Sequence, residues 1–281
     1  MTNAKTLFPP GHFYSPIVDV DEISIREEAF WTQRHLPGVD LRDEFQQHVL
    51  METIAKWMPY FNYPIDESDA NHNGYFLAND QFTWLDARSL FAFMCEFRPS
   101  RIIEVGSGYS TSIMIDVNSR FLDSSTCITC IEPYPRPVLR KSLASGGADL
   151  VQQKVQDVDP SFFDQLERGD FLFIDSSHVV KTGSDCAYLY LEVLPRLNPG
   201  VLIHIHDIFL PFEYPKRWVI EENRSWNEQY ILNALLTHSR GFQVIFGSAY
   251  VAALHREKAS KAVSANPEFG VGGGSFWIER L

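Results

Sequence analysis

The chain has 281 residues, a hydrophobic content of 45% and a formal net charge of −12 at pH 7. This length is enough for one large buried core, and the acidic balance without any Lys/Arg-rich stretch disfavours a nucleic-acid partner. The first twenty residues carry a Pro pair and polar breaks, and no segment approaches about 18 uninterrupted apolar residues, so we expect a soluble, cytoplasmic protein with no membrane partner.

The N-terminal part differs in composition from the rest of the chain. Residues 1 to about 75 are rich in Pro, aromatic and acidic residues, and the apolar positions of 40–58 recur at helical spacing. We expect an N-terminal accessory or cap region over 1–78, which contains this helix, and a main domain over 79–281.

From Asn79 onward, short apolar runs alternate with longer amphipathic segments, which indicates βα units and a parallel sheet. Strands are expected at 101–105, 127–132, 149–155, 171–175, 201–206 and 242–246. Helices are expected at 84–97, 110–121, 183–197 and 226–238. The chain ends in a glycine loop and a further strand, GVGGGSFWIERL. The predicted fold is a doubly wound, Rossmann-like α/β sheet of mainly parallel strands with an antiparallel C-terminal strand.

A glycine turn follows the first strand in the run EVGSGYST. Gly106 and Gly108 allow the backbone to turn tightly and to approach a ligand at the start of the next helix, although a purely structural turn also uses glycine. A dinucleotide-binding motif would carry another glycine where this chain has Thr111, which disfavours nicotinamide binding.

Acidic residues follow the next two strands. The carboxylate of Glu132, after the second strand, is suited to accept hydrogen bonds from both hydroxyls of a ribose. Asp157, after the third strand, is a candidate for binding an adenine amino group, with a turn-forming role as the alternative. Together with the glycine turn, Glu132 predicts a nucleoside site at the carboxyl edge of the sheet.

The densest group of ionisable residues lies in FIDSSH and HIHDIF, which close the fourth and fifth strands. They contribute Asp175, His178, His206 and Asp207, and buried apolar strands rarely end in such groups without a use. His204 lies deeper in the fifth strand and is expected to be a core histidine. Cys127 and Cys130 lie in a predicted strand and point to opposite faces, so we interpret them as small core residues rather than as a metal or redox pair.

This set of motifs resembles the class I S-adenosylmethionine-dependent methyltransferases, especially bacterial members of the family called methyltransferase domain 24. The resemblance rests on EVGSG, Glu132, FIDSSH, LPRLNPG and HIHDIF, and covers roughly residues 79–255. It implies that the methionine part of the cofactor is surrounded by Glu104, Gly106, Ser107 and Gly108. It further implies that Glu132 holds the ribose and that Asp157 binds the adenine amine.

Metal-dependent relatives such as catechol O-methyltransferase carry an Asp after strand four, a lysine base three residues later and an Asp-Asn pair after strand five. The resemblance therefore implies a metal site at Asp175, His206 and Asp207, with His178 in the place of the lysine as catalytic base beside Asp175. One histidine among oxygen ligands is compatible with Mg, Mn, Fe or Zn.

We therefore expect an enzyme that uses S-adenosylmethionine to methylate an oxygen of a small-molecule acceptor. Assistance from a divalent cation is one interpretation, and the other is a metal-free site in which Asp175 and His178 act as an acid/base pair while His206 and Asp207 shape the pocket. The aromatic residues Tyr75, Phe76, Phe82 and Trp84 are candidates for an acceptor wall, although such spacing is more often found in a core. Two alternatives stay open: an NAD- or nucleotide-dependent oxidoreductase on a similar sheet, and a non-enzymatic ligand-binding protein with solvated strand ends.

Overall fold

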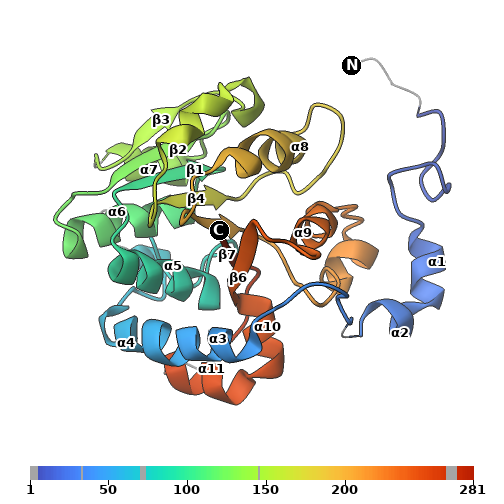
Figure 1. The fold of residues 1–281 in the computed structure, drawn as a ribbon, viewed down its shortest axis with the longest axis horizontal. Coiled ribbons are helices and arrows are strands. Elements are labelled where there is room, and N and C mark those ends of the chain that lie inside the picture. Colours follow the sequence, from blue (N-terminus) through green and yellow to red (C-terminus); the bar gives the residue numbers. More distant parts are fainter. Residues whose placement is uncertain (1–5, 33, 70–73, 145, 264–270) are drawn as a thin grey trace.

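A seven-stranded sheet forms the centre of the computed structural model, which describes residues 6–32, 34–69, 74–144, 146–263 and 271–281 (Figure 1). The strands are β1 (Arg101–Val105), β2 (Cys127–Ile131), β3 (Asp149–Val151), β4 (Phe171–Ile174), β5 (Leu202–Ile205), β6 (Phe242–Gly247) and β7 (Phe276–Arg280). They lie in the order β3-β2-β1-β4-β5-β7-β6, and β7 runs antiparallel to both of its neighbours. The predicted fold class is confirmed.

The helices of the main domain lie close to the predicted positions. α5 (Trp84–Phe97) coincides with its prediction, and α6 (Tyr109–Phe121) and α9 (Glu228–Leu236) differ only at their ends. The predicted helix 183–197 is divided into three pieces, and Pro195 lies at the start of the last one, where its missing N–H is tolerated. These pieces are α8 (Asp185–Tyr188), η6 (Leu189–Val193) and η7 (Leu194–Arg196). The remaining elements of this part are α7 (Pro137–Ala144), η4 (Val155–Asp157), η5 (Pro160–Gln165), η8 (Arg217–Glu221), α10 (Ser248–Leu254) and α11 (Arg256–Val263).

Two hydrophobic cores cover the two faces of the sheet. Alternating strand residues belong to different cores: Ile102 belongs to the core that contains residues of α5 and α6, whereas Ile103 belongs to the core that contains residues of η6 and α9. This follows from the two-residue repeat of a strand, and a parallel sheet with both faces covered needs apolar side chains on both. Cys130 is buried as expected, but Cys127 is exposed because it begins β2 at the edge of the core.

The predicted N-terminal helix 40–58 is present as a continuous helical segment of four pieces. They are α3 (Asp43–His48), η1 (Val49–Ile54), α4 (Ala55–Trp57) and η2 (Met58–Tyr60), followed by η3 (Glu67–Asp69). Leu50 and Ile54 of this segment are fully buried in the same core as α5. Tyr75 and Phe82 also belong to that core, whereas Trp84 is 43% exposed.

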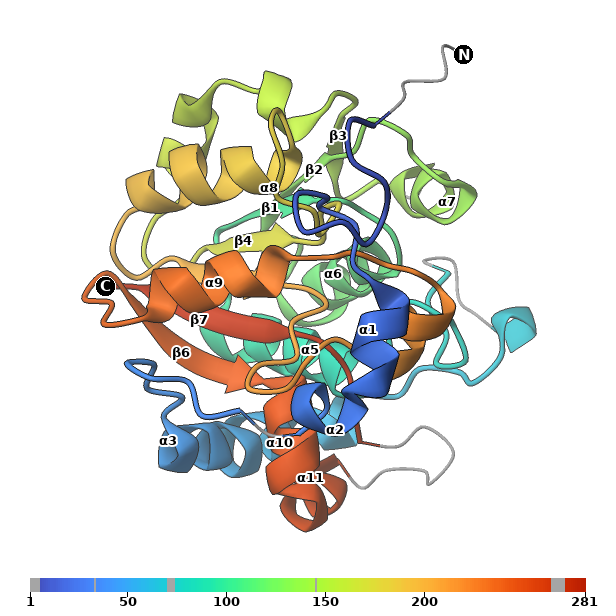
Figure 2. The ribbon, with the colours of Figure 1, turned by 90° about the vertical axis from the view of Figure 1, so that its right-hand side faces the viewer.

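Two short helices, α1 (Val20–Ile25) and α2 (Glu27–Phe30), lie on the outside of the segment that joins β5 to α9 (Figure 2). Every residue of both helices is at least partly exposed. The indole Nε1 of Trp31 donates to the carbonyl of Tyr214 over 2.9 Å, which fastens the end of α2 to this segment. Among the described residues, no helix is long and apolar enough to cross a membrane.

The strand register brings the predicted site residues to one edge of the sheet. Val105 pairs with Ile174, and Ile174 pairs with Ile205. The next residue of each strand is therefore Gly106, Asp175 or His206, and these three lie at the shared carboxyl edge of β1, β4 and β5. Open α/β sheets bind their ligands at this edge.

Candidate active site

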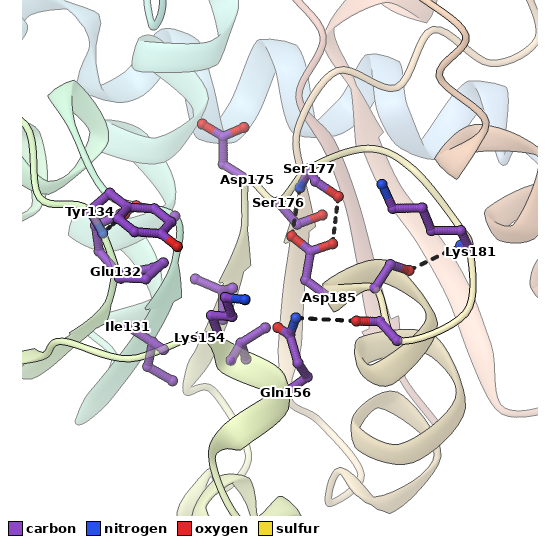
Figure 3. Close-up of a pocket in the computed structure, with 16 residues that line it drawn as sticks. Ile131, Glu132, Tyr134, Lys154, Gln156, Asp175, Ser176, Ser177, Lys181 and Asp185 are labelled. Carbon is purple, nitrogen blue, oxygen red and sulfur yellow. Dashed lines mark hydrogen bonds between the residues drawn. The ribbon is translucent and has the colours of Figure 1, made fainter. Parts of the chain in front are cut away.

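A cavity of about 490 Å³ lies at the carboxyl ends of β1, β2 and β4 (Figure 3). Its lining includes Gly106, Glu132, Gln156, Asp175, Ser177 and Asp185. Glu132 and Tyr134 lie on one side of the cavity, and Gln156, Ser177 and Asp185 lie on the other. This volume is within the range of small-molecule and cofactor sites.

The glycine turn is fixed by contact with the neighbouring strand. Gly106 has a φ of +76°, and a Cβ atom at this position would lie 1.9 Å from the carbonyl oxygen of Asp175. The amide N of Asp175 donates to the carbonyl of Val105 over 2.8 Å. Gly106 is therefore required both by its backbone conformation and by the close approach of β4, and it also lines the cavity.

Glu104 lies beneath the glycine turn rather than in the cavity. Its side chain is fully buried and accepts hydrogen bonds from the hydroxyls of Ser110 and Thr111, each over 2.5 Å. Burial raises the pKa of Glu104 to about 7 despite these hydrogen bonds, which lower it. The hydrogen bond of the Ser110 hydroxyl to Glu104 helps to hold the start of α6.

Glu132 faces the cavity, and its two carboxylate oxygens accept from the backbone. The amide N of Tyr134 donates over 2.7 Å, and the amide N of Ser107 donates over 3.4 Å. The Ser107 hydroxyl is buried without a hydrogen-bond partner among the described residues, a feature that suits a ligand contact. Gly108 caps α6, with its amide donating to Thr111 Oγ1.

Asp157, the predicted adenine ligand, is exposed and is not part of the cavity lining, whereas the preceding residue Gln156 is. Both residues lie in η4, a single tight turn. Lys181 and Asp185 are further lining residues that sequence reasoning missed, because they lie in the loop and helix after β4 and belong to no recognised motif.

His178 lies at the centre of the ionisable group. Its Nε2 is 3.4 Å from Asp175 Oδ1 and 3.5 Å from Asp207 Oδ2. One donor atom from each of these three residues lies within 4.8 Å of the others, which is a spacing that can hold a metal ion. His206, which the sequence predicts as a ligand, lies beside this group, with its Nε2 3.8 Å from Asp207 Oδ1.

A fully buried carboxylate holds the other ring nitrogen of His178. Glu228 Oε2 is 2.9 Å from His178 Nδ1. Sequence reasoning did not assign Glu228 a role, because it is 50 residues away from His178 in the chain. The sequence signal for Glu228 is a loose resemblance of the run NEQY, residues 227–230, to the methyltransferase family.

The backbone at two of these residues is strained. His178 has a φ of +60° and Asp207 has a φ of +56°, in the left-handed region that ordinary residues rarely adopt. Such strain persists only where the surrounding structure imposes it, and it concentrates at functional sites. His178 is held by the amides of Asn227 and Glu228, which both donate to its carbonyl.

The ionisable side chains around His178 shift one another's pKa values. Burial lowers the pKa of His178, but hydrogen bonds to Asp175 and Glu228 outweigh burial and hold that pKa well above its usual value. Burial raises the pKa of Asp207 and of Glu228. Burial also acts to raise the pKa of Asp175, but the charge of His206 and the hydrogen bond to His178 outweigh it and lower that pKa.

The pKa values of the two neighbouring histidines, His206 and His204, are shifted in opposite directions. Burial lowers the pKa of His206, but the charges of Asp207 and Asp175 outweigh burial and raise it. His204 is fully buried, and burial holds its pKa well below the usual value. Its Nε2 is 2.8 Å from Ser275 Oγ, as expected for a hydrogen-bonded core histidine.

A second cavity of about 410 Å³ includes Asp207 in its lining. Its lining combines aromatic and polar side chains, including Trp84, Phe209, Trp218, Asp80, His206 and Asp207. Trp84 has a φ of +49° at the start of α5, so its exposed ring is held in a strained backbone conformation. Of the aromatic residues predicted as an acceptor wall, Trp84 is the one that lines this cavity, because Tyr75, Phe76 and Phe82 are buried.

The chain is similar to several known proteins. Residues 103–208 match the family model of a methyltransferase domain. An uncharacterized protein of Archaeoglobus fulgidus is 42% identical over 165 residues, which are 57% of this chain and 74% of that protein. Among solved structures, a methyltransferase from Geobacter sulfurreducens has 14% identity and a TM-score of 0.41, with 95% of this chain and 100% of that chain covered. The plantazolicin methyltransferase BpumL, solved with a substrate analog and S-adenosylhomocysteine, has 10% identity and a TM-score of 0.44 over 68% of this chain and 83% of its own.

The matched segment begins in β1 and ends just after β5, so it contains the glycine turn, Glu132 and the strand-end group around His178. Gly106, Glu132 and Asp175 of this segment line the cavity at the carboxyl ends of β1, β2 and β4. Residues 103–208 therefore form a methyltransferase domain of the S-adenosylmethionine-dependent class.

Proposed function

We propose that this methyltransferase transfers the methyl group to a hydroxyl oxygen of a small-molecule acceptor, and that a divalent cation held by Asp175, His178 and Asp207 assists the transfer. S-adenosylmethionine would occupy the first cavity, with its ribose on Glu132 and its methionine part near Gly106 and Ser107. The acceptor would occupy the second cavity, against Trp84.

One observation carries this proposal: one donor atom from each of Asp175, His178 and Asp207 lies within 4.8 Å of the others. Asp175 lines the first cavity and Asp207 lines the second. An acceptor oxygen near these side chains would therefore lie close to both the cation and the cofactor. Holding two reactants in such an arrangement removes much of the entropic barrier to their reaction.

The chemistry of the donor set suits a cation. Three carboxylates, from Asp175, Asp207 and Glu228, surround the single imidazole of His178. Buried negative charges are costly unless positive charge compensates them, and two oxygens with one nitrogen suit Mn, Fe or Zn as well as Mg. When bound, a divalent cation at these side chains would favour loss of the proton from an acceptor hydroxyl.

The geometry favours different roles for the two histidines from those predicted by the sequence. His206 lines the acceptor cavity, whereas His178 is in the lining of neither cavity, and its Nδ1 is engaged by Glu228. We therefore assign His178 to the cation and His206 Nε2 to the acceptor proton. The deprotonated oxygen then attacks the methyl carbon, and the electron pair of the carbon–sulfur bond stays on sulfur, which leaves S-adenosylhomocysteine.

The test combines cation binding with turnover. S-adenosylhomocysteine release is measured over a panel of phenols, sugars and hydroxy acids, with chelated enzyme and with Mg²⁺, Mn²⁺, Co²⁺ or Zn²⁺ added back. We expect turnover to be lost after chelation and restored by one of these ions. Full turnover after verified metal removal would contradict the proposed role of the cation.

Two single variants separate the histidine roles. We expect His178→Ala to bind Co²⁺ much more weakly in calorimetry, through the two remaining carboxylates, and His206→Ala to keep Co²⁺ binding but to lose about 10²- to 10⁴-fold in turnover, the usual contribution of a general base. The reverse result would support the assignment from sequence, with His206 as ligand and His178 as base.

A further inference from the structure

The start of α9 forms a close support behind His178. Glu228 is fully buried, and its Oε2 lies 2.9 Å from His178 Nδ1. The backbone amides of Asn227 and Glu228 donate to the His178 carbonyl over 3.0 and 3.2 Å. The ring of Trp226 lies against the imidazole, with the ring centres 4.3 Å apart. Three consecutive residues therefore hold both the strained backbone and the ring of His178.

The contact with Glu228 determines which ring nitrogen of His178 is available. A carboxylate only accepts hydrogen bonds, so Nδ1 carries the donated proton and Nε2 is the nitrogen that would bind a cation. Nε2 is the atom that faces Asp175 Oδ1 and Asp207 Oδ2, at 3.4 and 3.5 Å. In metalloproteins, a ligating histidine generally donates its other N–H to such a partner, which fixes the ring and increases the basicity of the ligand. A cation at Nε2 would take the place of the proton that this nitrogen carries in the empty group.

A purely structural role explains Glu228 less well. An uncharged side chain of similar size would fill the same space without the cost of a buried carboxylate. The carboxylate also adds a third negative charge beside Asp175 and Asp207. That charge opposes folding of the empty group, and it strengthens the attraction for a cation bound by the group.

We propose that Glu228 is a positioning residue that orients His178 Nε2 toward the divalent cation and increases the cation affinity of the site. This inference rests on the proposed function, because it requires the cation at Asp175, His178 and Asp207. It adds a fourth residue, distant in sequence, which touches neither cofactor nor acceptor and acts through His178.

Co²⁺ binding to the full chain tests this role without any acceptor. Calorimetry gives the affinity, and the visible absorption of bound Co²⁺ reports loss of a histidine nitrogen from its ligands. The variants are Glu228→Gln, which keeps the shape and removes the charge, and Glu228→Asp, which keeps the charge and shortens the side chain. Glu213→Gln is the matched control, because Glu213 is a buried carboxylate that also holds α9, through Gln229 and Tyr230.

We expect both Glu228 variants to bind Co²⁺ about 10- to 100-fold more weakly, with an altered absorption spectrum, as for other residues that support a metal ligand. The Glu213→Gln variant should bind Co²⁺ like the wild type, and all three variants should keep S-adenosylhomocysteine affinity, which also shows that they fold. In a His178→Ala background, Glu228→Gln should have no further effect, because it acts through His178.

Wild-type Co²⁺ affinity and spectrum in both folded Glu228 variants would overturn the inference and leave the proposed function intact. An undiminished effect of Glu228→Gln in the His178→Ala background would also overturn it. A different result would contradict the cation site itself. If the wild-type protein binds S-adenosylhomocysteine but no divalent cation, both the proposed function and the role of Glu228 are overturned.

Discussion

Glu104 opens the glycine motif, and the family resemblance implies that it surrounds the cofactor, but its carboxylate lies under the turn. Its two oxygens hold the hydroxyls of Ser110 and Thr111 at the start of α6. The sequence identified the residue through its motif, yet it gave no information on which way the side chain points. That direction depends on which helix covers each face of the sheet: Glu104 lies in β1 on the same face as Ile102, and α6 contributes to the core on that face.

The buried carboxyl of Glu104 predicts a pH-dependent stability. In the unfolded chain it ionises near 4.5, whereas burial raises its folded pKa to about 7. Between these values the folded state holds a proton that the unfolded state has released, so the free energy of unfolding falls as pH rises through this window. The expected loss is about 3 kcal/mol, at 1.36 kcal/mol for each pKa unit.

The Glu104→Gln variant isolates this contribution. Urea unfolding is measured for both proteins at pH 4.5, 6 and 8, and the difference between the two free energies of unfolding is compared across pH. We expect the variant to gain stability relative to the wild type as pH rises, with a plateau above about pH 7. A pH-independent difference would show that Glu104 ionises normally in the folded protein.

Glu132 is expected to contribute directly to cofactor binding. Its replacement by Gln preserves shape but weakens charge-assisted hydrogen bonds to the ribose, so we expect S-adenosylhomocysteine affinity to fall by about 1 to 3 kcal/mol in calorimetry. Asp157→Asn is the matched control, because Asp157 is exposed and outside the cavity lining. A loss for Asp157→Asn and none for Glu132→Gln would support the adenine role and remove Glu132 from the site.

The elements were more predictable than the details of the site. The sequence predicts both ends of α5 because its helical pattern is long. It also predicts the polar ends of β4 and β5, because ionisable residues directly follow two apolar runs there. Three features could not be predicted. Whether Gln156 or Asp157 lines the cavity depends on the geometry of the single turn η4. The contact of Glu228 with His178 joins residues 50 positions apart in the chain. The position of the glycine loop before β7 depends on tertiary packing.

That glycine loop is held by a buried carboxylate on α5. Asp86 accepts from the amides of Gly274 and Ser275 over 2.9 and 2.7 Å. The carbonyl of Gly274 in turn accepts from Ile208, and a Cβ at Gly274 would lie 2.9 Å from Asp207 Cα. The loop therefore packs directly against the backbone of Asp207, a proposed cation ligand.

Removal of the Asp86 carboxylate should loosen the loop. In Asp86→Ala, two buried amides lose their acceptor, so we expect a loss of about 2 to 4 kcal/mol in the free energy of unfolding measured with urea, together with weaker Co²⁺ binding. Asp80→Ala is the control, because Asp80 is exposed and lines the second cavity together with Asp86. A substitution of such a surface residue should change the free energy of unfolding by no more than about 0.5 kcal/mol. Equal effects of the two substitutions would show that the loop does not depend on Asp86.

The division of the whole chain into an accessory region over 1–78 and a main domain is still a prediction. Within this region, α1 and α2 lie on the outside, with all of their residues at least partly exposed. Further along, Leu50 and Ile54 have no exposed surface and pack into the same core as α5. The two parts of the N-terminal region should therefore differ in their importance for folding.

Two truncated chains test this difference. A chain that lacks residues 1–30 loses only α1, α2 and the segment before them, so we expect a cooperative thermal transition and wild-type S-adenosylhomocysteine binding. A chain that lacks residues 1–78 also loses Leu50 and Ile54, and each buried aliphatic side chain of this kind contributes about 2 to 5 kcal/mol. Because a domain of ordinary stability has only about 5 to 15 kcal/mol in total, we expect no cooperative transition in circular dichroism for the shorter chain. If a chain that begins at residue 79 unfolds cooperatively and binds S-adenosylhomocysteine, the region before it is an accessory part as the sequence predicts, and the core formed by β1 to β7 is stable without it.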